Sequence, residues 1–252
     1  MTAAQTGSQR VLVIGATSAI ATAVMRRYAQ LGARLFIVGR RAQALGAAAA
    51  DLRVRGARDV ESAQLDVDDI QSQQRVLDAA WSKWAGLDVV LVAHGALPDQ
   101  FSAQGSVEET LASFDTNGRS VIALLTDLAN RFEPQGSGVI AVISSPAGDR
   151  GRASNYVYGA AKAAVSTFAS GLRHRLYSKG VRVVTILPGL VDTPMTAGFR
   201  KGPLWASPER VAGDILRALQ RCNGPMYTPW FWRPIMVIVT HLPESLFLRS
   251  RL

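Results

Sequence analysis

The chain has 252 residues, of which 48% are hydrophobic, so it can bury a large core as one α/β domain. Its single cysteine, Cys222, rules out an intramolecular disulfide, and its three histidines are scattered, so no metal site is predicted. The formal net charge of +9 suits an anionic cofactor or an anionic membrane surface. The arginines form no run or known nucleic-acid-binding motif, so we expect no nucleic acid.

Short β-branched runs alternate with longer helical patterns along the chain. The runs predict six strands: Val11–Ile14, Leu35–Val38, Val60–Leu65, Val89–Ala93, Val139–Ser144 and Val181–Leu187. Near-continuous apolar strands joined by helices are typical of a parallel sheet with helices on both faces. We therefore predict a single Rossmann-type, doubly wound domain over residues 1–252, with residues 226–252 as an apolar C-terminal extension.

The first strand runs directly into a turn of small residues and then into a helix. Small side chains let backbone amides approach a pyrophosphate, and the helix N-terminus adds unpaired N–H groups and partial positive charge. The predicted phosphate contacts are Gly15, Thr17, Ser18, Ala19 and Ile20. An ordinary tight turn is the alternative, because Gly15 is the only glycine in this stretch.

Two arginines, Arg40 and Arg41, follow the second predicted strand, and no acidic residue stands at its end. An acid there would bind the adenosine ribose hydroxyls and repel a 2′-phosphate, whereas arginine attracts that phosphate. The sequence thus favours NADP(H) over NAD(H). The alternative is a pair of solvated arginines that open a helix.

Tyr158 and Lys162 are four residues apart in a predicted helix, so their side chains share one face. A lysine ammonium about 4 Å from the phenol would lower the pKa of the tyrosine by on the order of three units, enough for proton transfer near pH 7. A chance pair on an exposed helix is the alternative.

With this spacing and the small-residue turn, the chain resembles the short-chain dehydrogenase/reductase family over nearly its whole length. Ser145 lies 13 residues before Tyr158, and Asn117 matches the asparagine of the family tetrad. The resemblance implies that Asn117, Ser145, Tyr158 and Lys162 are catalytic. It implies further cofactor contacts from Asp66, Val67, Ala93, His94, Gly95, Tyr158, Lys162, Pro188, Gly189, Val191 and Thr193.

Two departures from the family pattern concern the cofactor contacts. Ala93-His94-Gly95-Ala96 stands where the family has Asn-Asn-Ala-Gly, which places His94 near the expected ribose. Ala19 and Ala21 stand where the family has glycines. We expect His94 to be a structural substitute rather than a catalytic group.

The resemblance also implies a mechanism for carbonyl reduction. Tyr158 would protonate the carbonyl oxygen as hydride arrives from NADPH, with Ser145 bound to the same oxygen. Lys162 would lower the pKa of Tyr158 and hold ribose hydroxyls, while Asn117 would hold a water that links Lys162 to solvent. Substrate contacts are expected from Ser145, Tyr158, Leu97, Arg150 and Arg152, although the two arginines have solvation as an alternative.

The most hydrophobic passage, Trp230–Leu242, is too short to span a bilayer, which needs about 20 apolar residues. Its tryptophans, with Arg233, Arg249 and Arg251 nearby, suit the interface of a membrane. A helix packed over the substrate cleft and an oligomer contact are the alternatives. Residues 144–162 and 241–247 are similar to a branch of the family that reduces lipid-linked keto sugars.

We therefore predict an NADPH-dependent oxidoreductase that reduces a ketone to a secondary alcohol, or the reverse, on a lipid-linked keto sugar or another amphiphilic substrate. A soluble short-chain dehydrogenase for a small alcohol or ketone is one alternative, and a non-catalytic NADP-sensing protein is another. Residues 1–9 lack the apolar core of a signal peptide, so the expected location is cytoplasmic, with peripheral membrane contact. A homo-oligomer is expected from the family resemblance.

Overall fold

The computed structural model describes residues 9–250. Residues 1–8 and 251–252 lie outside this range, so most of the N-terminal segment and Arg251, both used in the sequence predictions, are not described.

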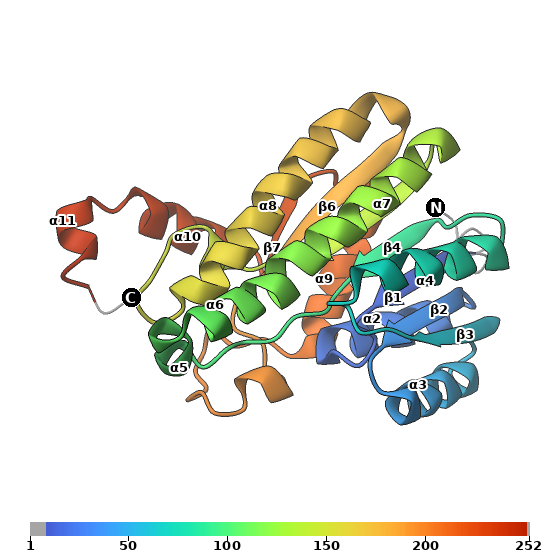
Figure 1. Cartoon of the computed structure of the whole chain (residues 1–252), viewed down its shortest axis with the longest axis horizontal. Coiled ribbons are helices and arrows are strands. Elements are labelled where there is room, and N and C mark those ends of the chain that lie inside the picture. The colour runs from blue at the N-terminus through green and yellow to red at the C-terminus, as the bar shows by residue number, and fades with distance from the viewer. Residues whose placement is uncertain (1–8, 251–252) are drawn as a thin grey trace.

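Seven parallel strands form one sheet in the order β3-β2-β1-β4-β5-β6-β7 (Figure 1). Their bounds are β1 Arg10–Ile14, β2 Arg34–Gly39, β3 Asp59–Gln64, β4 Val89–Val92, β5 Gly138–Ile143, β6 Val181–Pro188 and β7 Pro225–Thr228. The first six match the predicted strands to within two residues at each end, and the doubly wound parallel sheet is confirmed.

The seventh strand, β7, was not predicted from the sequence. It is short and starts at a proline, and it lacks the β-branched run that marks the other strands. Its pairing with β6 places it at the sheet edge, with Thr185 opposite Pro225 and Pro188 opposite Thr228. Residues 226–228 therefore belong to the sheet, and the C-terminal extension begins after Thr228.

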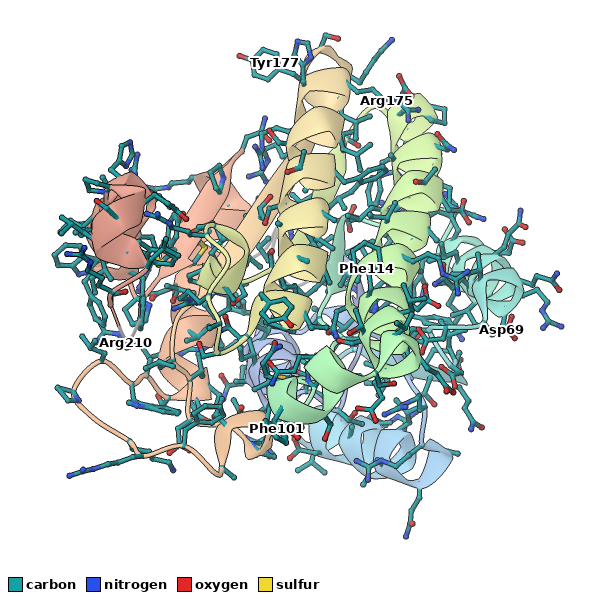
Figure 2. All side chains as sticks on the ribbon, turned by 60° about the vertical axis from the view of Figure 1, so that its left-hand side comes forward. Asp69, Phe101, Phe114, Arg175, Tyr177 and Arg210 are labelled. Carbon is teal, nitrogen blue, oxygen red and sulfur yellow. The ribbon has the colours of Figure 1, made fainter. Side chains whose placement is uncertain are left out.

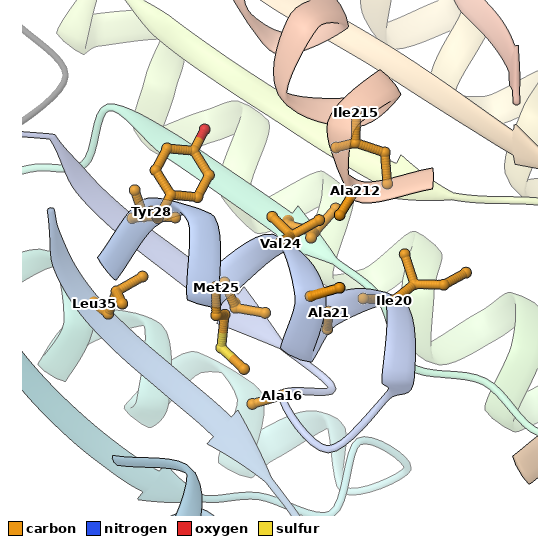
Figure 3. Close-up of a cluster of buried hydrophobic side chains, with 14 of the residues drawn as sticks. Ala16, Ile20, Ala21, Val24, Met25, Tyr28, Leu35, Ala212 and Ile215 are labelled. Carbon is orange, nitrogen blue, oxygen red and sulfur yellow. The ribbon is translucent and has the colours of Figure 1, made fainter. Parts of the chain in front are cut away.

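Helices cover both faces of the sheet (Figure 1). One face carries α2 (Ala19–Gln30), α3 (Ala42–Val54) and α9 (Pro208–Arg221). The other face carries α4 (Ile70–Lys83), α7 (Ser120–Gln135) and α8 (Tyr156–Leu176). Figure 3 shows the first layer, where side chains of α2 point toward Ala212 and Ile215 of α9.

Successive side chains of a strand point to opposite faces of the sheet, so each strand can pack against both helix layers. Val11 and Val13 of β1 join the core under α2, whereas Leu12 and Ile14 join the core under α7 and α8. All four side chains have no exposed surface. Apolar residues on both faces are what a central parallel strand requires.

Shorter helices connect and extend this frame. They are α5 (Gln100–Gly105), α6 (Val107–Phe114), a π-helical turn (Asp115–Arg119), 3₁₀ turns at Pro146–Gly148, Tyr177–Lys179 and Pro194–Thr196, and the tail helices α10 (Trp232–His241) and α11 (Glu244–Phe247). Helices α7 and α8 lie side by side (Figure 2). Within residues 9–250 no helix has both the length and the apolar character needed to cross a membrane.

The strand order reverses direction between β1 and β4, which are neighbours in the sheet although β2 and β3 lie between them in sequence. In open parallel sheets, ligands bind outside the carboxyl ends of the strands at such a switch point. A ligand-binding site is therefore expected at this edge of the sheet.

Candidate active site

A cavity of about 590 Å³ lies along the carboxyl ends of the strands. Residues at or just after the ends of β1 to β6 line it: Gly15, Gly39, Leu65, Ala93, Ser144 and Gly189. The cavity thus runs past the switch point and continues toward the C-terminal tail.

The turn after β1 brings the backbone close to the next strand end. Gly15 has φ +88, and a Cβ there would lie 2.5 Å from the backbone nitrogen of His94, so no other residue fits without displacement. Ser18 caps α2 without a side-chain hydrogen bond to the helix, so that side chain leaves the first N–H groups of α2 uncapped. Ser18, Ala19 and Ile20 line the cavity, and this end suits a pyrophosphate.

Arg40 and Arg41 line the cavity where it passes β2, and both side chains are exposed. Neither guanidinium forms an ion pair with another residue in the range 9–250. Val67 lines the cavity too, but Asp66 does not. The exposed Asp66 carboxylate accepts a hydrogen bond from the backbone N–H of Asp68 at 3.2 Å, and its contact with the cofactor stays a prediction.

His94 follows β4 and points one ring nitrogen at Ser120. The Ser120 hydroxyl donates to the Thr116 carbonyl at 2.8 Å, so its oxygen must accept the His94 Nε2–H at 3.0 Å. Burial, with a smaller contribution from the charge of Lys162, lowers the pKa of His94 to about 3. His94 is therefore neutral, and its Nδ1 is a bare acceptor without a partner among the described residues.

Asn117 lies in the π-helical turn that separates α6 from α7, a distortion often found at functional sites. Its amide nitrogen donates to the carbonyls of Ala96 at 2.8 Å and Ser113 at 3.0 Å, and its oxygen accepts the Ala96 N–H at 2.9 Å. Asn117 is 1% exposed and does not line the cavity. Its contacts hold the loop after β4, and the predicted water relay stays a prediction.

Gly95 allows this loop to approach the centre of the site. A Cβ at Gly95 would lie 2.9 Å from Asn117 Oδ1 and 3.5 Å from Lys162 Nζ. The side chains of Asn117 and Lys162 therefore both reach the space that a Cβ at Gly95 would occupy.

Tyr158, Ser145 and Lys162 all line the cavity. Burial raises the pKa of Tyr158 to about 12, and the side-chain hydrogen bond with Ser145 opposes that rise. Lys162 is 1% exposed; its Nζ donates to the Ile143 carbonyl at 3.2 Å and lies 5.5 Å from the centroid of the Tyr158 ring. Burial lowers the pKa of Lys162 to about 8.

These values correct one prediction. The sequence predicted an ammonium about 4 Å from the phenol that lowers the pKa of Tyr158. In the structure the pKa of Tyr158 is raised, because loss of hydration around the phenol outweighs the hydrogen bond with Ser145, which favours the phenolate. The phenol is protonated at neutral pH.

The other end of the cavity, where the substrate is expected and which is called the substrate end below, combines four segments distant in sequence. Leu97 comes from the loop after β4, and Arg152 and Asn155 come from the loop before α8. Leu190, Met195 and Phe199 follow β6, and Trp232 begins α10. The alternative in which the tail packs over the cleft therefore holds for Trp232.

Arg150 does not line the cavity, and this corrects its predicted substrate contact. Its guanidinium donates to the carbonyls of Val239 at 2.8 Å and Leu242 at 2.7 Å, and it pairs with Glu244 at 2.7 Å. The same group lies 3.7 Å from the centroid of the Phe247 ring. Arg150 anchors the tail instead, because the tail supplies its hydrogen-bond acceptors.

Most predicted site residues line one cavity. Every predicted cofactor residue except Asp66 is part of its wall, as are the predicted substrate residues except Arg150. Sequence reasoning missed Asn155, Thr116, Met195, Phe199 and Trp232 as lining residues. No local motif marks them; only the tail's unusual aromatic content pointed toward Trp232.

Comparison with known proteins agrees with this geometry. A family profile described as "short chain dehydrogenase" matches residues 9–203. An uncharacterized oxidoreductase of Mycobacterium tuberculosis is 36% identical over 244 residues, covering 97% of this chain and 98% of the relative. An uncharacterized oxidoreductase of Streptomyces coelicolor is 34% identical, covering 95% and 94%.

Two solved structures share the fold. A variant of actinorhodin polyketide ketoreductase, solved with NADPH, superposes with a TM-score of 0.79 at 23% identity, covering 88% of this chain and 96% of that one. Levodione reductase gives a TM-score of 0.79 at 21% identity, covering 89% and 97%. The chain belongs to the short-chain dehydrogenase family and is an NAD(P)-dependent oxidoreductase.

Proposed function

We propose that the protein uses NADPH to reduce a ketone to a secondary alcohol, with Asn117, Ser145, Tyr158 and Lys162 as its catalytic tetrad. The observation that carries this proposal is the half-buried Tyr158 phenol, hydrogen-bonded to Ser145 in the wall of the cavity that also holds the uncapped end of α2. A protonated phenol at this position is an acid ready to act on a carbonyl oxygen.

A bound nicotinamide would supply the hydride, and the remaining chemistry falls to side chains of this chain. Ser145 Oγ accepts the Ala147 N–H at 3.1 Å, which leaves its own proton available for the carbonyl oxygen. Tyr158 gives its proton to that oxygen, and the nearby Lys162 charge stabilises the resulting phenolate. Asn117 and His94 position the loop that borders Lys162.

The proposed preference for NADP(H) rests on two arginines that follow β2. Arg40 and Arg41 are exposed there, line the cavity and have no ion-pair partner within residues 9–250. An arginine side chain free of other charges can bind a 2′-phosphate. The solved ketoreductase of the same fold was crystallised with NADPH, which supports the same choice.

An amphiphilic substrate is supported by the apolar rim of the cavity. Met195 and Phe199 line it and are nevertheless 46% and 53% exposed. A long apolar group attached to the ketone would cover such side chains. The similarity of residues 144–162 and 241–247 to decaprenylphosphoryl-2-keto-β-D-erythro-pentose reductase points in the same direction, toward a lipid-linked keto sugar.

Two surface contacts remain proposals. Trp230, Val237 and Ile238 are exposed in the tail and suit peripheral membrane contact. Phe101, Val107 and Leu111 are exposed on α5 and α6, beside the helices that carry Asn117 and Tyr158, and suit a homo-oligomer; Figure 2 shows Phe101 at the surface. Liposome sedimentation of the full chain and of a variant truncated after Thr228 tests the first contact, and light scattering tests the second.

The central test is a spectrophotometric assay of NADPH and NADH oxidation with a panel of ketones that differ in alkyl chain length. We expect NADPH to be preferred and longer chains to be reduced more efficiently. Equal efficiency for short ketones would favour the small-molecule alternative. NADPH binding without oxidation by any ketone would favour the NADP-sensing alternative.

A further inference from the structure

We infer that Trp232, at the start of the tail helix α10, is a specificity-determining residue that donates its indole N–H to a substrate oxygen other than the reacting carbonyl. This inference rests on the proposed ketone reduction. Ser145 and Tyr158 serve the carbonyl, so a further donor in the same cavity is available to another part of the substrate.

The distribution of unpaired polar atoms carries the argument. Within residues 9–250, five buried side-chain atoms lack a hydrogen-bond partner, and four of them belong to residues that line this one cavity. The four are His94 Nδ1, Arg152 Nε, Asn155 Oδ1 and Trp232 Nε1. Buried polar groups are ordinarily paired, so their concentration in one cavity indicates partners that come from a ligand.

Three of these atoms lie in residues of the substrate end. His94 borders the expected cofactor, whereas Arg152, Asn155 and Trp232 come from the loop before α8 and from the tail. Arg152 Nε and Trp232 Nε1 can only donate, and Asn155 Oδ1 can only accept. A hydroxyl group beside the carbonyl offers both an acceptor and a donor, whereas a plain ketone has neither apart from its reacting carbonyl oxygen.

Among Arg152, Asn155 and Trp232, the position of Trp232 is the one most closely defined by packing. A Cβ at Gly189 would lie 1.9 Å from Trp232 Nε1, so the indole packs against the Gly189 backbone, in space that only a glycine leaves open. Gly189 belongs to the segment expected to hold the nicotinamide carboxamide. The indole N–H therefore lies beside the place where hydride transfer is proposed.

Arg150 and Asp149 keep the tail in this position. Arg150 binds two carbonyls near the end of α10 and pairs with Glu244 of α11, and its side chain is 14% exposed. Asp149 accepts the Tyr227 hydroxyl of β7 at 2.9 Å. The loop that follows Ser145 is thus bound to the chain both before and after Trp232.

The test compares two matched substrates and two matched variants of the full chain. We would measure kcat/KM with NADPH for cyclohexanone and 2-hydroxycyclohexanone in the parent protein, in Trp232→Phe and in Trp230→Phe. Trp230 is 72% exposed and does not line the cavity, so its variant controls for the loss of one indole from this aromatic segment.

We expect the parent protein to prefer the hydroxy ketone. Trp232→Phe should reduce that preference by about five- to tenfold, the value of one neutral hydrogen bond, and Trp230→Phe should leave it unchanged. An unchanged preference in Trp232→Phe would overturn the inference. An equal loss for both ketones would also overturn it, because it would reveal a role in packing only.

A binding measurement separates this inference from the proposed function. In the presence of NADP⁺, cyclohexane-1,2-diol should raise the Tm of the parent protein more than cyclohexanol does, and Trp232→Phe should remove the difference. Absence of that difference in the parent protein would overturn the inference. Failure to oxidise NADPH with any ketone, together with an intact diol effect, would overturn the proposed function alone.

Discussion

The two ends of the cavity differ in what supplies their contacts. At the cofactor end, residues that directly follow β1, β2 and β4 line the wall, and the chain at Gly15 lies so close to His94 that a Cβ would not fit. At the substrate end, side chains from the loop before α8, the segment after β6 and the tail meet instead. Arg150 donates a hydrogen bond to the carbonyl of Leu242, 92 residues away, and so holds the tail against the loop before α8.

This difference has a physical basis. Backbone at the end of a buried strand is held by the sheet, so the cofactor end keeps its shape whatever the outer side chains are. The substrate end depends on contacts between segments that carry no common hydrogen-bond ladder. Changes at the cofactor end should therefore alter nucleotide affinity, and changes at the substrate end should alter KM for the ketone.

The largest expected effect comes from Tyr158→Phe, which removes the proposed acid where the two ends meet. Turnover should fall by roughly 10²- to 10⁴-fold, the usual contribution of a positioned acid. NADPH affinity, measured by fluorescence titration, should be nearly unchanged because the ring remains. Retention of most of the activity would show that the chemistry lies elsewhere.

The pH dependence of stability tests the burial of Lys162. Its pKa is about 8 in the folded state against an ordinary value of 10.5, so the unfolded chain binds more protons between these values. The free energy of unfolding should therefore rise from pH 8 toward pH 10.5, by on the order of 3 kcal/mol from this group alone. Urea titrations should show that rise weakened in Lys162→Met; identical slopes for both proteins would contradict it.

Gly15→Ala tests the cofactor end directly. The added Cβ would lie 2.5 Å from His94 N at a residue with φ +88, and such strain costs roughly 1–3 kcal/mol. We expect NADPH affinity to fall by about ten- to a hundredfold, measured by calorimetry. Gly46→Ala is the matched control, because nothing lies within 4 Å of a Cβ at that position in α3. Equal behaviour of the two variants would refute the close approach.

Arg40→Ala should act on one cofactor and not on the other. Loss of an exposed charged contact with a 2′-phosphate should weaken NADPH binding by about five- to tenfold at low salt and leave NADH binding unchanged. The NADPH affinity of Arg40→Lys should lie between that of the parent protein and that of Arg40→Ala. Parallel NADPH and NADH titrations provide the measurement, and tighter binding of NADH by the parent protein would reverse the assignment.

Arg150→Met should affect the substrate end alone. Without its guanidinium the tail loses two carbonyl contacts and the Glu244 pair, so KM for the ketone should rise by roughly fivefold with NADPH affinity unchanged. Limited proteolysis should cut the tail faster. Glu244→Gln is the mild control, because Glu244 is 71% exposed and exposed pairs contribute little. A weaker affinity for NADPH in Arg150→Met would contradict the separation of the two ends.

The sequence anticipated residues that lie on the sheet frame better than residues placed by packing. Gly15 could be predicted as a lining residue because it follows a strand with a clear apolar run, and Ala93 and Gly189 because of the family resemblance. The role of Arg150 was predicted wrongly, because its position after Ser145 says nothing of the tail that binds it. Strand β7 was missed for a related reason: β6 provides its pairing, and its own four residues provide almost no signal.

By itself, the sequence determined the doubly wound sheet and the positions of six strands along the chain, since apolar periodicity is a local property that each segment carries alone. It also determined that Tyr158 and Lys162 share a helix face, because helix geometry sets that spacing. Only the tertiary structure decided the raised pKa of Tyr158, since burial depends on all the segments that surround the phenol. The structure alone also placed Trp232 in the cavity wall, because that contact joins residues far apart in the chain.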